Sequence, residues 1–223
     1  LGNIFPVREI LKNYHPEVLR LFMLQSHYRS PVDYSDDSLT EARAGLLRCY
    51  STLQQMKELQ GKLTANTRSV PDKHSGHQDN YINKFKELSD KFDEAMDDDF
   101  NTAQALGHVF EMVRLTNNFI TEEKSIAVSD KTKILAEATK VFGHFGEVLG
   151  VINSDADEFF SFYKETELRK RGLNVDEIED LIKQRQSARV QKDWARADAI
   201  RKQLAEFNII LKDSANGTSW IIE

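Results

Sequence analysis

Helix-breaking residues are scarce in this sequence, and this scarcity constrains the fold more than any other feature. The 223 residues include only 4 prolines and 10 glycines. Because proline removes a backbone donor and glycine is costly to order, so few of them leave most of the chain free to form helices. A hydrophobic content of 40% and a charged content of 30% fit a globular protein with one large or two modest domains. We therefore expect a mainly α fold.

Apolar residues recur at helical spacing along most of the chain. In the longest such segment, Leu39, Ala42 and Leu46 share one face. The polar segment 61–79 is predicted to be a surface loop. Residues 150–172, which carry the aromatic cluster "EFFSFY", are predicted to be a connection that contains a domain boundary. The remaining pattern predicts an antiparallel helical bundle with helices near 6–14, 16–28, 36–60, 80–96, 102–121 and 129–149.

The part of the chain after residue 172 has a different pattern. Asn174 and Glu177 are spaced as a capping box, which predicts the start of a helix. Asp193 is suited to cap a second helix over 194–206, so that the two helices form a hairpin. The pair Asn216-Gly217 separates "IILKD" from "TSWII" and predicts a β-hairpin. We expect a small α+β domain made of a helical hairpin and a C-terminal β-hairpin.

Several function classes are excluded by the sequence. It contains no apolar stretch long enough to span a bilayer, and no P-loop, nucleophile elbow or dinucleotide-binding motif. The single cysteine, Cys49, excludes an internal disulfide and fits a reducing cytoplasm. We expect a cytoplasmic protein without membrane association, and no catalytic residue, metal ligand or cofactor in this chain. The absence of an initiator methionine suggests a fragment.

One acidic run invites a metal-binding interpretation. Residues 97–99 are all aspartate, but three successive side chains point in different directions, and the spacing of a calcium-binding loop is missing. Asn101 or Thr102, supported by Gln104, is instead suited to cap the helix that follows. We therefore interpret the run as part of a helix-capping segment.

Positive charge gathers in the predicted helical hairpin. Between residues 181 and 202, seven lysines and arginines stand against two aspartates, a local charge of +5 in a chain whose formal net charge is −6. Trp194 stands at the start of the second helix. Its ring would either pack in or beside the core, or offer a platform on which an RNA base stacks. The charge and the ring together make this hairpin a candidate RNA-binding surface.

Side chains of both charge signs would serve such a surface. Arginine and lysine contact phosphates, while a carboxylate accepts hydrogen bonds from base amino groups. Asp198 and Asp213 are candidates for the second task. His27, at a predicted helix end, would contact phosphate together with Arg29, or would cap carbonyl groups. Further candidates for contacts with an RNA backbone are Arg185, Lys192 and Arg196.

Three motifs occur in order along the chain. They are "LGN…VREIL…YHPEVLRLFMLQSHYRSPVDYS", "AMDDDFNTAQAL" and "LIKQRQSARVQKDWARADAIRKQLAEFNIILKDSANGTSW". In this combination the sequence resembles the C-terminal half of the cysteinyl-tRNA synthetases, which are class I aminoacyl-tRNA synthetases. In that family, the ATP-handling KMSKS loop ends immediately before the L-G-N that stands here at residues 1–3. The resemblance covers nearly the whole chain, apart from the loop at 61–79.

The resemblance implies a task for each part of the chain. Residues 1–35 would contact the tRNA stem, residues 36–165 would form a helical tRNA-binding bundle, and residues 172–223 would recognise the anticodon. The parent enzyme would attach cysteine to tRNA(Cys) using ATP with Mg, and a Zn site would select cysteine. These groups would belong to the catalytic half of the same protein, the expected partner of this part, so this part alone would be catalytically inactive.

The resemblance also implies the residues that contact the anticodon. The positions that match the family's contact residues are Arg189, Trp194, Asp198 and Asp213, and here they would recognise the anticodon GCA. The sequence departs from the family pattern in two places: Asn208 stands where the family usually has glycine, and Ala103 where it often has proline. Neither departure involves the proposed contact residues.

Two other functions remain as alternatives. The first is a helical protein-interaction module without RNA binding, in which the basic hairpin is only a solvated surface. The second is a related cysteine ligase that makes a small thiol and uses no tRNA. The anticodon-type segment from about residue 172 onward argues against this second alternative.

Overall fold

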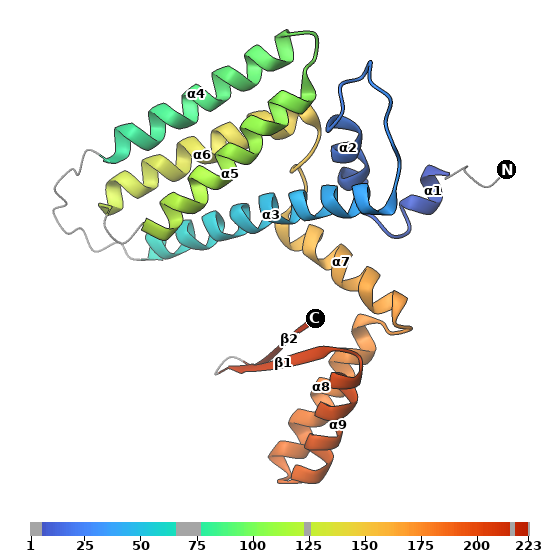
Figure 1. The fold of residues 1–223 in the computed structure, drawn as a ribbon. Coiled ribbons are helices and arrows are strands. Elements are labelled where there is room, and N and C mark those ends of the chain that lie inside the picture. The colour runs from blue at the N-terminus through green and yellow to red at the C-terminus, as the bar shows by residue number, and fades with distance from the viewer. Residues whose placement is uncertain (1–5, 66–76, 123–125, 215–216, 223) are drawn as a thin grey trace. The chain divides into compact units, whose positions relative to one another are not determined.

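The computed structural model describes residues 6–65, 77–122, 126–214 and 217–222 (Figure 1). Within these ranges the chain forms nine α-helices and one antiparallel sheet of two strands. It divides between Phe159 and Phe160 into two compact units, called unit 1 and unit 2 below. In the described ranges, every helix is too polar or too short to span a lipid bilayer.

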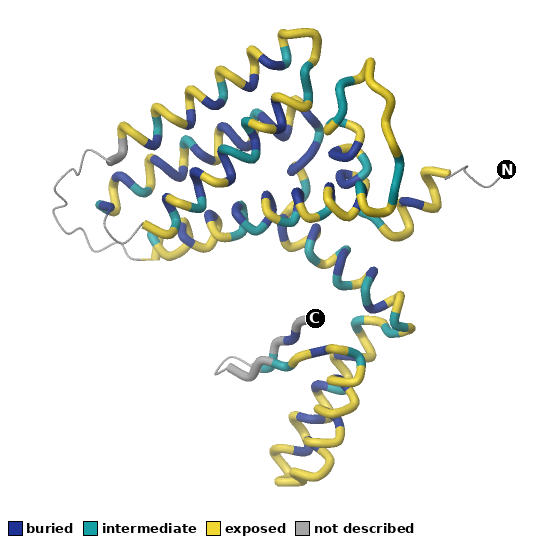
Figure 2. The backbone as a smooth tube through the Cα atoms, in the orientation of Figure 1, coloured by how far each residue is buried: buried dark blue, intermediate teal, exposed yellow. Residues whose placement is uncertain are grey.

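Unit 1 is a bundle of long helices preceded by two short ones. The helices are α1 (Val7–Ile10), α2 (Pro16–Leu24), α3 (Asp36–Ala65), α4 (His77–Asp97), α5 (Thr102–Glu122) and α6 (Val128–Leu149). Helix α4 packs against α5 and α6, α3 packs against the same two helices, and α2 packs against α3. Consecutive long helices run in opposite directions, and their buried residues face the interior of the bundle (Figures 1 and 2).

Aromatic side chains fill the interior of unit 1. Phe85, Phe92, Phe119 and Phe145 are fully buried, and the ring centres of Phe92 and Phe145 lie 4.5 Å apart between α4 and α6. Each such ring removes a large apolar area from water, which stabilises the bundle. Cys49 is also buried here, and its burial raises the pKa of the thiol to about 12. The predicted antiparallel bundle is confirmed.

Unit 2 is a small α+β domain. Its elements are the part of α7 (Ala156–Lys170) that follows Phe159, α8 (Val175–Val190), α9 (Trp194–Glu206), β1 (Ile209–Ser214) and β2 (Gly217–Ile222). The strands pair antiparallel, with Leu211 opposite Trp220. Trp220 belongs to a small apolar core to which α7, α8, α9 and β1 each contribute, and the ammonium group of Lys164 lies 3.2 Å from its ring centre. The predicted helical hairpin and the antiparallel strand pair are confirmed. Gly217, predicted in the turn, is instead the first residue of β2, and Asn216 lies outside the described residues.

The local signals that predicted these elements are present as hydrogen bonds. The Asn174 side chain accepts from the backbone N–H of Glu177 at 2.9 Å, and the Glu177 carboxylate accepts from that of Asn174 at 3.1 Å. Asp193 caps α9 by accepting from the backbone N–H of Arg196 at 3.0 Å. Asn208 has the left-handed conformation expected where the family usually has glycine, with a φ of 55°.

The predicted connection at 150–172 is wrong over most of its length, because α7 occupies Ala156–Lys170. The helix starts where the Asp155 carboxylate accepts from the backbone N–H of Asp157 at 2.9 Å. Phe159 and Tyr163, one turn apart, are both buried. The cluster "EFFSFY" therefore belongs to a helix whose aromatic residues pack, rather than to an irregular segment.

Several predicted helix ends also differ from the structure. Helix α3 continues to Ala65 and α4 begins at His77, so both enter the predicted loop at 61–79, whose residues 66–76 lie outside the described part. The predicted helices at 6–14 and 16–28 are shorter, since α1 ends at Ile10 and α2 at Leu24. Apolar spacing locates a helix well but its ends poorly, because the ends depend on caps and tertiary contacts.

The capping box of α8 provides a test of unit 2. Asn174→Ala removes the side-chain acceptor for the Glu177 N–H and should lower the free energy of unfolding by about 1 kcal/mol. Ser187→Ala, an exposed position within the same helix, should leave stability unchanged or raise it slightly. Urea unfolding followed by circular dichroism measures both. Equal losses in the two variants would contradict this account of the helix start.

Candidate nucleic-acid interface

The turn between α8 and α9 shapes the candidate surface. Helix α8 ends at Val190, and Lys192 then takes a left-handed conformation with a φ of 60°. The backbone N–H of Asp193 donates to the carbonyl of Ala188 at 2.8 Å, which closes the turn. The Asp193 side chain then caps α9. We call residues 189–196 the hairpin tip.

The hairpin tip exposes two apolar side chains. Trp194, the first residue of α9, has 59% of its surface exposed, and Val190 has 84%. The small residues Ala188 and Ala197 are buried where the two helices face each other. A core position for Trp194, which the sequence left open, is therefore wrong. The exposed ring is available to a partner.

Exposed charged side chains lie close to Trp194 in the sequence. Arg189, Lys192 and Arg196 are exposed residues of the hairpin tip. Asp198 is exposed as well and lies four residues after Trp194, so the two share a face of α9. The same face continues to a shallow hollow of about 280 Å³ lined by Asp198, Arg201, Lys202 and Ala205. An aromatic ring, cations and a carboxylate thus occur together on one helix end.

One predicted contact residue, Arg185, differs from this arrangement, and the side chain of another, Asp213, is not described. Arg185 was expected at the surface, but only 8% of it is exposed, because it lies on the face of α8 that carries Ile178 and Ile182. The prediction that Arg185 is exposed and so able to contact an RNA backbone is therefore wrong. Asp213 lies in β1 opposite Thr218, but its side chain is outside the described part of the chain.

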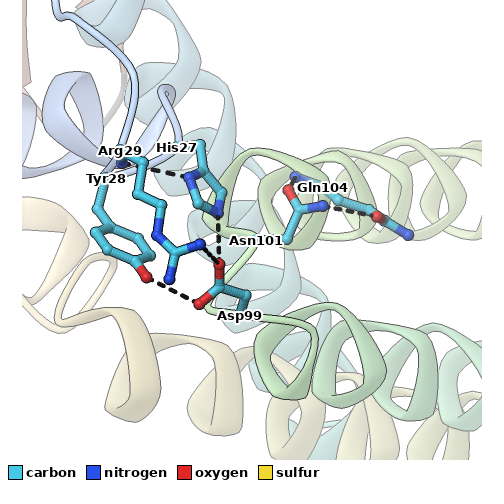
Figure 3. A network of polar contacts seen from close by, with 6 residues as sticks. All are labelled: His27, Tyr28, Arg29, Asp99, Asn101 and Gln104. Carbon is cyan, nitrogen blue, oxygen red and sulfur yellow. Dashed lines mark hydrogen bonds and ion pairs between the residues drawn. The ribbon is translucent and has the colours of Figure 1, made fainter.

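His27 and Arg29, the two candidates in unit 1, face a carboxylate (Figure 3). Arg29 lies 3.0 Å from a carboxylate oxygen of Asp99, and His27 Nε2 lies 3.8 Å from the same oxygen. The Tyr28 hydroxyl donates to the other oxygen at 2.8 Å, and this hydrogen bond raises the pKa of the phenol. Both candidates are therefore engaged with Asp99, and a phosphate would have to share them with this carboxylate.

The same contacts give a structural role to Asp99, the last residue of the acidic run at 97–99. Asp99 and Phe100 both have left-handed backbones, with φ values of 54° and 53°, and Asp99 is turned toward the segment that follows α2. Asn101 then caps α5 by accepting from the backbone N–H of Gln104 at 3.2 Å (Figure 3). The predicted helix cap is confirmed. In the described ranges, no three histidine, cysteine or acidic side chains are grouped closely enough to hold a metal ion.

Comparison with protein families assigns three segments of the chain. Residues 171–220 match the cysteinyl-tRNA ligase anticodon binding domain, residues 91–153 match the DALR domain, and residues 1–44 match the class I (C) tRNA synthetase catalytic domain. A cysteine–tRNA ligase of Geotalea daltonii is 42% identical over 230 aligned residues and matches 100% of this chain. The chain is therefore similar to cysteine–tRNA ligases along its whole length.

Other members of the family match over the same extent. Cysteine–tRNA ligases of Solidesulfovibrio magneticus and Geobacter metallireducens are 40% and 41% identical, again over 100% of this chain. The chain spans 44–45% of the length of these relatives. The hairpin tip lies within the segment 171–220, which matches the anticodon binding domain of these ligases. The match of residues 1–44 to the catalytic domain extends beyond the predicted segment 1–35.

Sequence reasoning missed two features of these surfaces. Val190 was treated only as the last residue of a helix, yet it is the most exposed apolar residue at the hairpin tip. The sequence did contain a signal for this exposure. Val190 stands among charged residues at the end of a polar helix, and its position is not on the face that carries the buried residues. Asp99 was treated as part of a cap, and its contacts with residues 71 positions away had no sequence signal.

The left-handed Asp99 provides a stability test for unit 1. Asp99→Ala should lower the free energy of unfolding by about 1–2 kcal/mol, because alanine tolerates this conformation poorly. It also removes the acceptor for Tyr28 and Arg29. Asp99→Asn should cost less, since asparagine tolerates a positive φ and keeps one carbonyl oxygen.

Asp98→Ala is the matched control, because Asp98 is an exposed neighbour whose φ is not positive. Its stability should remain near that of the unchanged chain. Chemical denaturation of the three variants gives the comparison. An equal decrease in the free energy of unfolding in Asp98→Ala and Asp99→Ala would contradict this account of Asp99.

Proposed function

We propose that this chain binds and recognises tRNA(Cys) within a cysteine–tRNA ligase whose intact form attaches cysteine to that tRNA using ATP. The observation that carries the proposal is the exposed Trp194 at the hairpin tip, next to exposed cations, in the segment that matches the family's anticodon binding domain. RNA loops present unstacked bases, and proteins bind such bases by stacking aromatic rings on them.

Each residue of the surface has a role that its chemistry supports. Trp194 stacks on a base of the anticodon GCA. Arg189 donates to acceptors on a base edge, and Asp198 and Asp213 accept from the amino groups that guanine, cytosine and adenine each carry. Lys192 and Arg196 contact neighbouring phosphates, which contributes affinity without sequence preference.

The other parts of the chain have proposed roles as well. Residues 1–35 contact the tRNA stem, residues 36–165 form the helical tRNA-binding bundle, and residues 172–223 form the anticodon-recognition domain. His27 and Arg29 contact the tRNA backbone while sharing Asp99. The catalytic half of the same cytoplasmic protein holds ATP with Mg, and its Zn selects cysteine, as the family resemblance implies.

Substitutions at the hairpin tip test anticodon recognition directly. In the intact ligase, Trp194→Ala and Arg189→Ala should each weaken tRNA binding by on the order of 1–3 kcal/mol, because one base contact is lost. The KM for tRNA(Cys) should rise, while cysteine activation by ATP should stay unchanged. Aminoacylation and pyrophosphate exchange assays measure the two steps separately.

Two further measurements sharpen this test. Trp194→Phe keeps a stacking ring and should recover part of the lost affinity. A tRNA(Cys) with a changed anticodon should bind weakly even to the unchanged ligase. Trp194→Ala should therefore lower the affinity for this tRNA by less than it lowers the affinity for the normal tRNA(Cys). Unchanged aminoacylation kinetics in both alanine variants would contradict the proposed role of the hairpin tip.

The salt dependence of binding tests the phosphate contacts. Lys192→Ala and Arg196→Ala should each reduce the slope of log K against log salt concentration by about 0.7–0.9, because fewer counterions are released. Lys183→Ala is the control, since Lys183 lies on α8 away from the hairpin tip and pairs with Asp180 at 3.4 Å. Fluorescence titrations of tRNA at several salt concentrations give the slopes. A slope that falls equally in the control would count against these two contacts.

A further inference from the structure

Glu17 is a buried carboxylate in unit 1 that none of the proposed tRNA contacts uses. It is the second residue of α2, and only 8% of it is exposed. Its Oε2 accepts from the backbone N–H of Ile152 at 2.7 Å and from the Tyr50 hydroxyl at 2.7 Å. Its Oε1 accepts from the backbone N–H groups of Asn153 and Ser154 at 3.2 and 3.3 Å, and from the Ser154 hydroxyl at 3.1 Å. A buried charge needs such donors to offset its lost hydration.

The segment that supplies these donors has an unusual backbone. Gly150 and Ile152 both lie in the left-handed region, with φ values of 65° and 55°. For a β-branched residue such as Ile152 this conformation is strained, and it persists only where surrounding contacts enforce it. The conformation turns three successive N–H groups toward one carboxylate, an arrangement that binds anions. Arg20 fixes the start of the segment by donating to the Gly150 carbonyl at 2.7 Å.

Helix α7 begins directly after this segment. Phe159, in its first turn, stacks on the ring of Tyr50 with the ring centres 3.9 Å apart, and it meets His15 edge to face at 5.0 Å. The hydroxyl of the same Tyr50 donates to Glu17, and the Ser154 N–H donates to that hydroxyl at 3.1 Å. Residues 150–155 and the first turn of α7 are therefore held by one connected group of contacts centred on Glu17.

These contacts join segments that belong to different family domains. Glu17 lies in the part that matches the catalytic domain, whereas Ile152 and Asn153 close the match to the DALR domain. Helix α7 then continues without interruption to Lys170, and the match to the anticodon binding domain begins at residue 171. The first turn of α7 is thus the point from which the chain leaves unit 1 toward the anticodon-binding domain.

We propose that Glu17 is a positioning residue for tRNA charging: it fixes residues 150–155 and the first turn of α7, and so the start of the connection to the anticodon-binding domain. The inference rests on the proposed function. A tRNA that contacts a protein at two places binds tightly only if the two places are held at a suitable separation. If the start of this connection is not held in place, the effective concentration of the second contact site around a tRNA already bound at the first site falls. The affinity of each site by itself is unchanged.

Glu17→Gln in the full-length ligase tests this role. In glutamine, an NH2 group replaces one of the two carboxylate oxygens that accept hydrogen bonds. At least one of the backbone N–H groups that donate to Glu17 therefore loses its acceptor. The kcat/KM for intact tRNA(Cys) should fall about tenfold or more through KM, because the two contacts no longer act together. The affinity for a hairpin RNA carrying only the anticodon stem and loop should stay unchanged, as should cysteine activation.

Two other variants keep the test decisive. Tyr50→Phe removes one donor and keeps the three backbone N–H contacts, so it should shift KM for intact tRNA in the same direction by a smaller factor, even if Glu17→Gln fails to fold. Glu9→Gln is the matched control, because Glu9 is an exposed acid that pairs with Lys12 at 2.6 Å, and it should change nothing.

The outcomes separate the possible failures. An unchanged KM for intact tRNA in a folded Glu17→Gln protein, with only the melting temperature lowered, would overturn the positioning role. A parallel loss of affinity for the hairpin RNA would overturn it as well, because the defect would then lie in the recognition surface itself. Failure of the unchanged ligase to bind the hairpin RNA would instead contradict the proposed function.

Discussion

The small apolar core of unit 2 is the constraint on which the hairpin tip depends. The core forms where α7, α8, α9 and the β-hairpin meet, and it buries Trp220 but leaves Trp194 outside. The small residues Ala188 of α8 and Ala197 of α9 are also buried. Trp220 is the tryptophan that packs in this core, whereas Trp194 lies exposed at the hairpin tip.

Left-handed residues that are not glycine mark the ends of helices throughout the chain. Lys192 closes the turn before α9, Asn208 ends α9, and Asp99 lies between α4 and α5. At each of these places a backbone or side-chain hydrogen bond holds the conformation, as at Asp193 for the hairpin tip. Ile152 is the most costly case, and it is the one that a buried carboxylate compensates. Asp99 and Ile152, but not Lys192 and Asn208, are also positions where segments distant in sequence are joined.

The features that could be predicted from the sequence are those with local causes. The capping box at Asn174 and the caps at Asp193 and Asn101 depend on residues within three positions, so their spacing alone indicates them. The basic character of the hairpin is a matter of composition over one segment. The family resemblance supplied the specific contact residues, and three of them, Arg189, Trp194 and Asp198, are exposed on or beside the hairpin tip.

The features that could not be predicted depend on long-range contacts. Asp99 meets residues about 70 positions earlier, and Glu17 meets a segment 135 positions later, so no local spacing indicates either group. Helix α7 was missed because its aromatic residues are buried by distant partners, such as Tyr50 for Phe159. Arg185 was misplaced because a charged residue predicts exposure, whereas the face of α8 on which it lies is buried.

The chain contains only two tryptophans, one exposed and one buried, and this permits a direct test of the central claim. The measurement is the NMR signal of each indole N–H group while a hairpin RNA with the anticodon GCA is added to the chain. The account predicts that the signal of Trp194 shifts and that of Trp220 changes little, and that a hairpin with an altered anticodon has a much weaker effect. A Trp194 signal that stays in place while the RNA binds would contradict it.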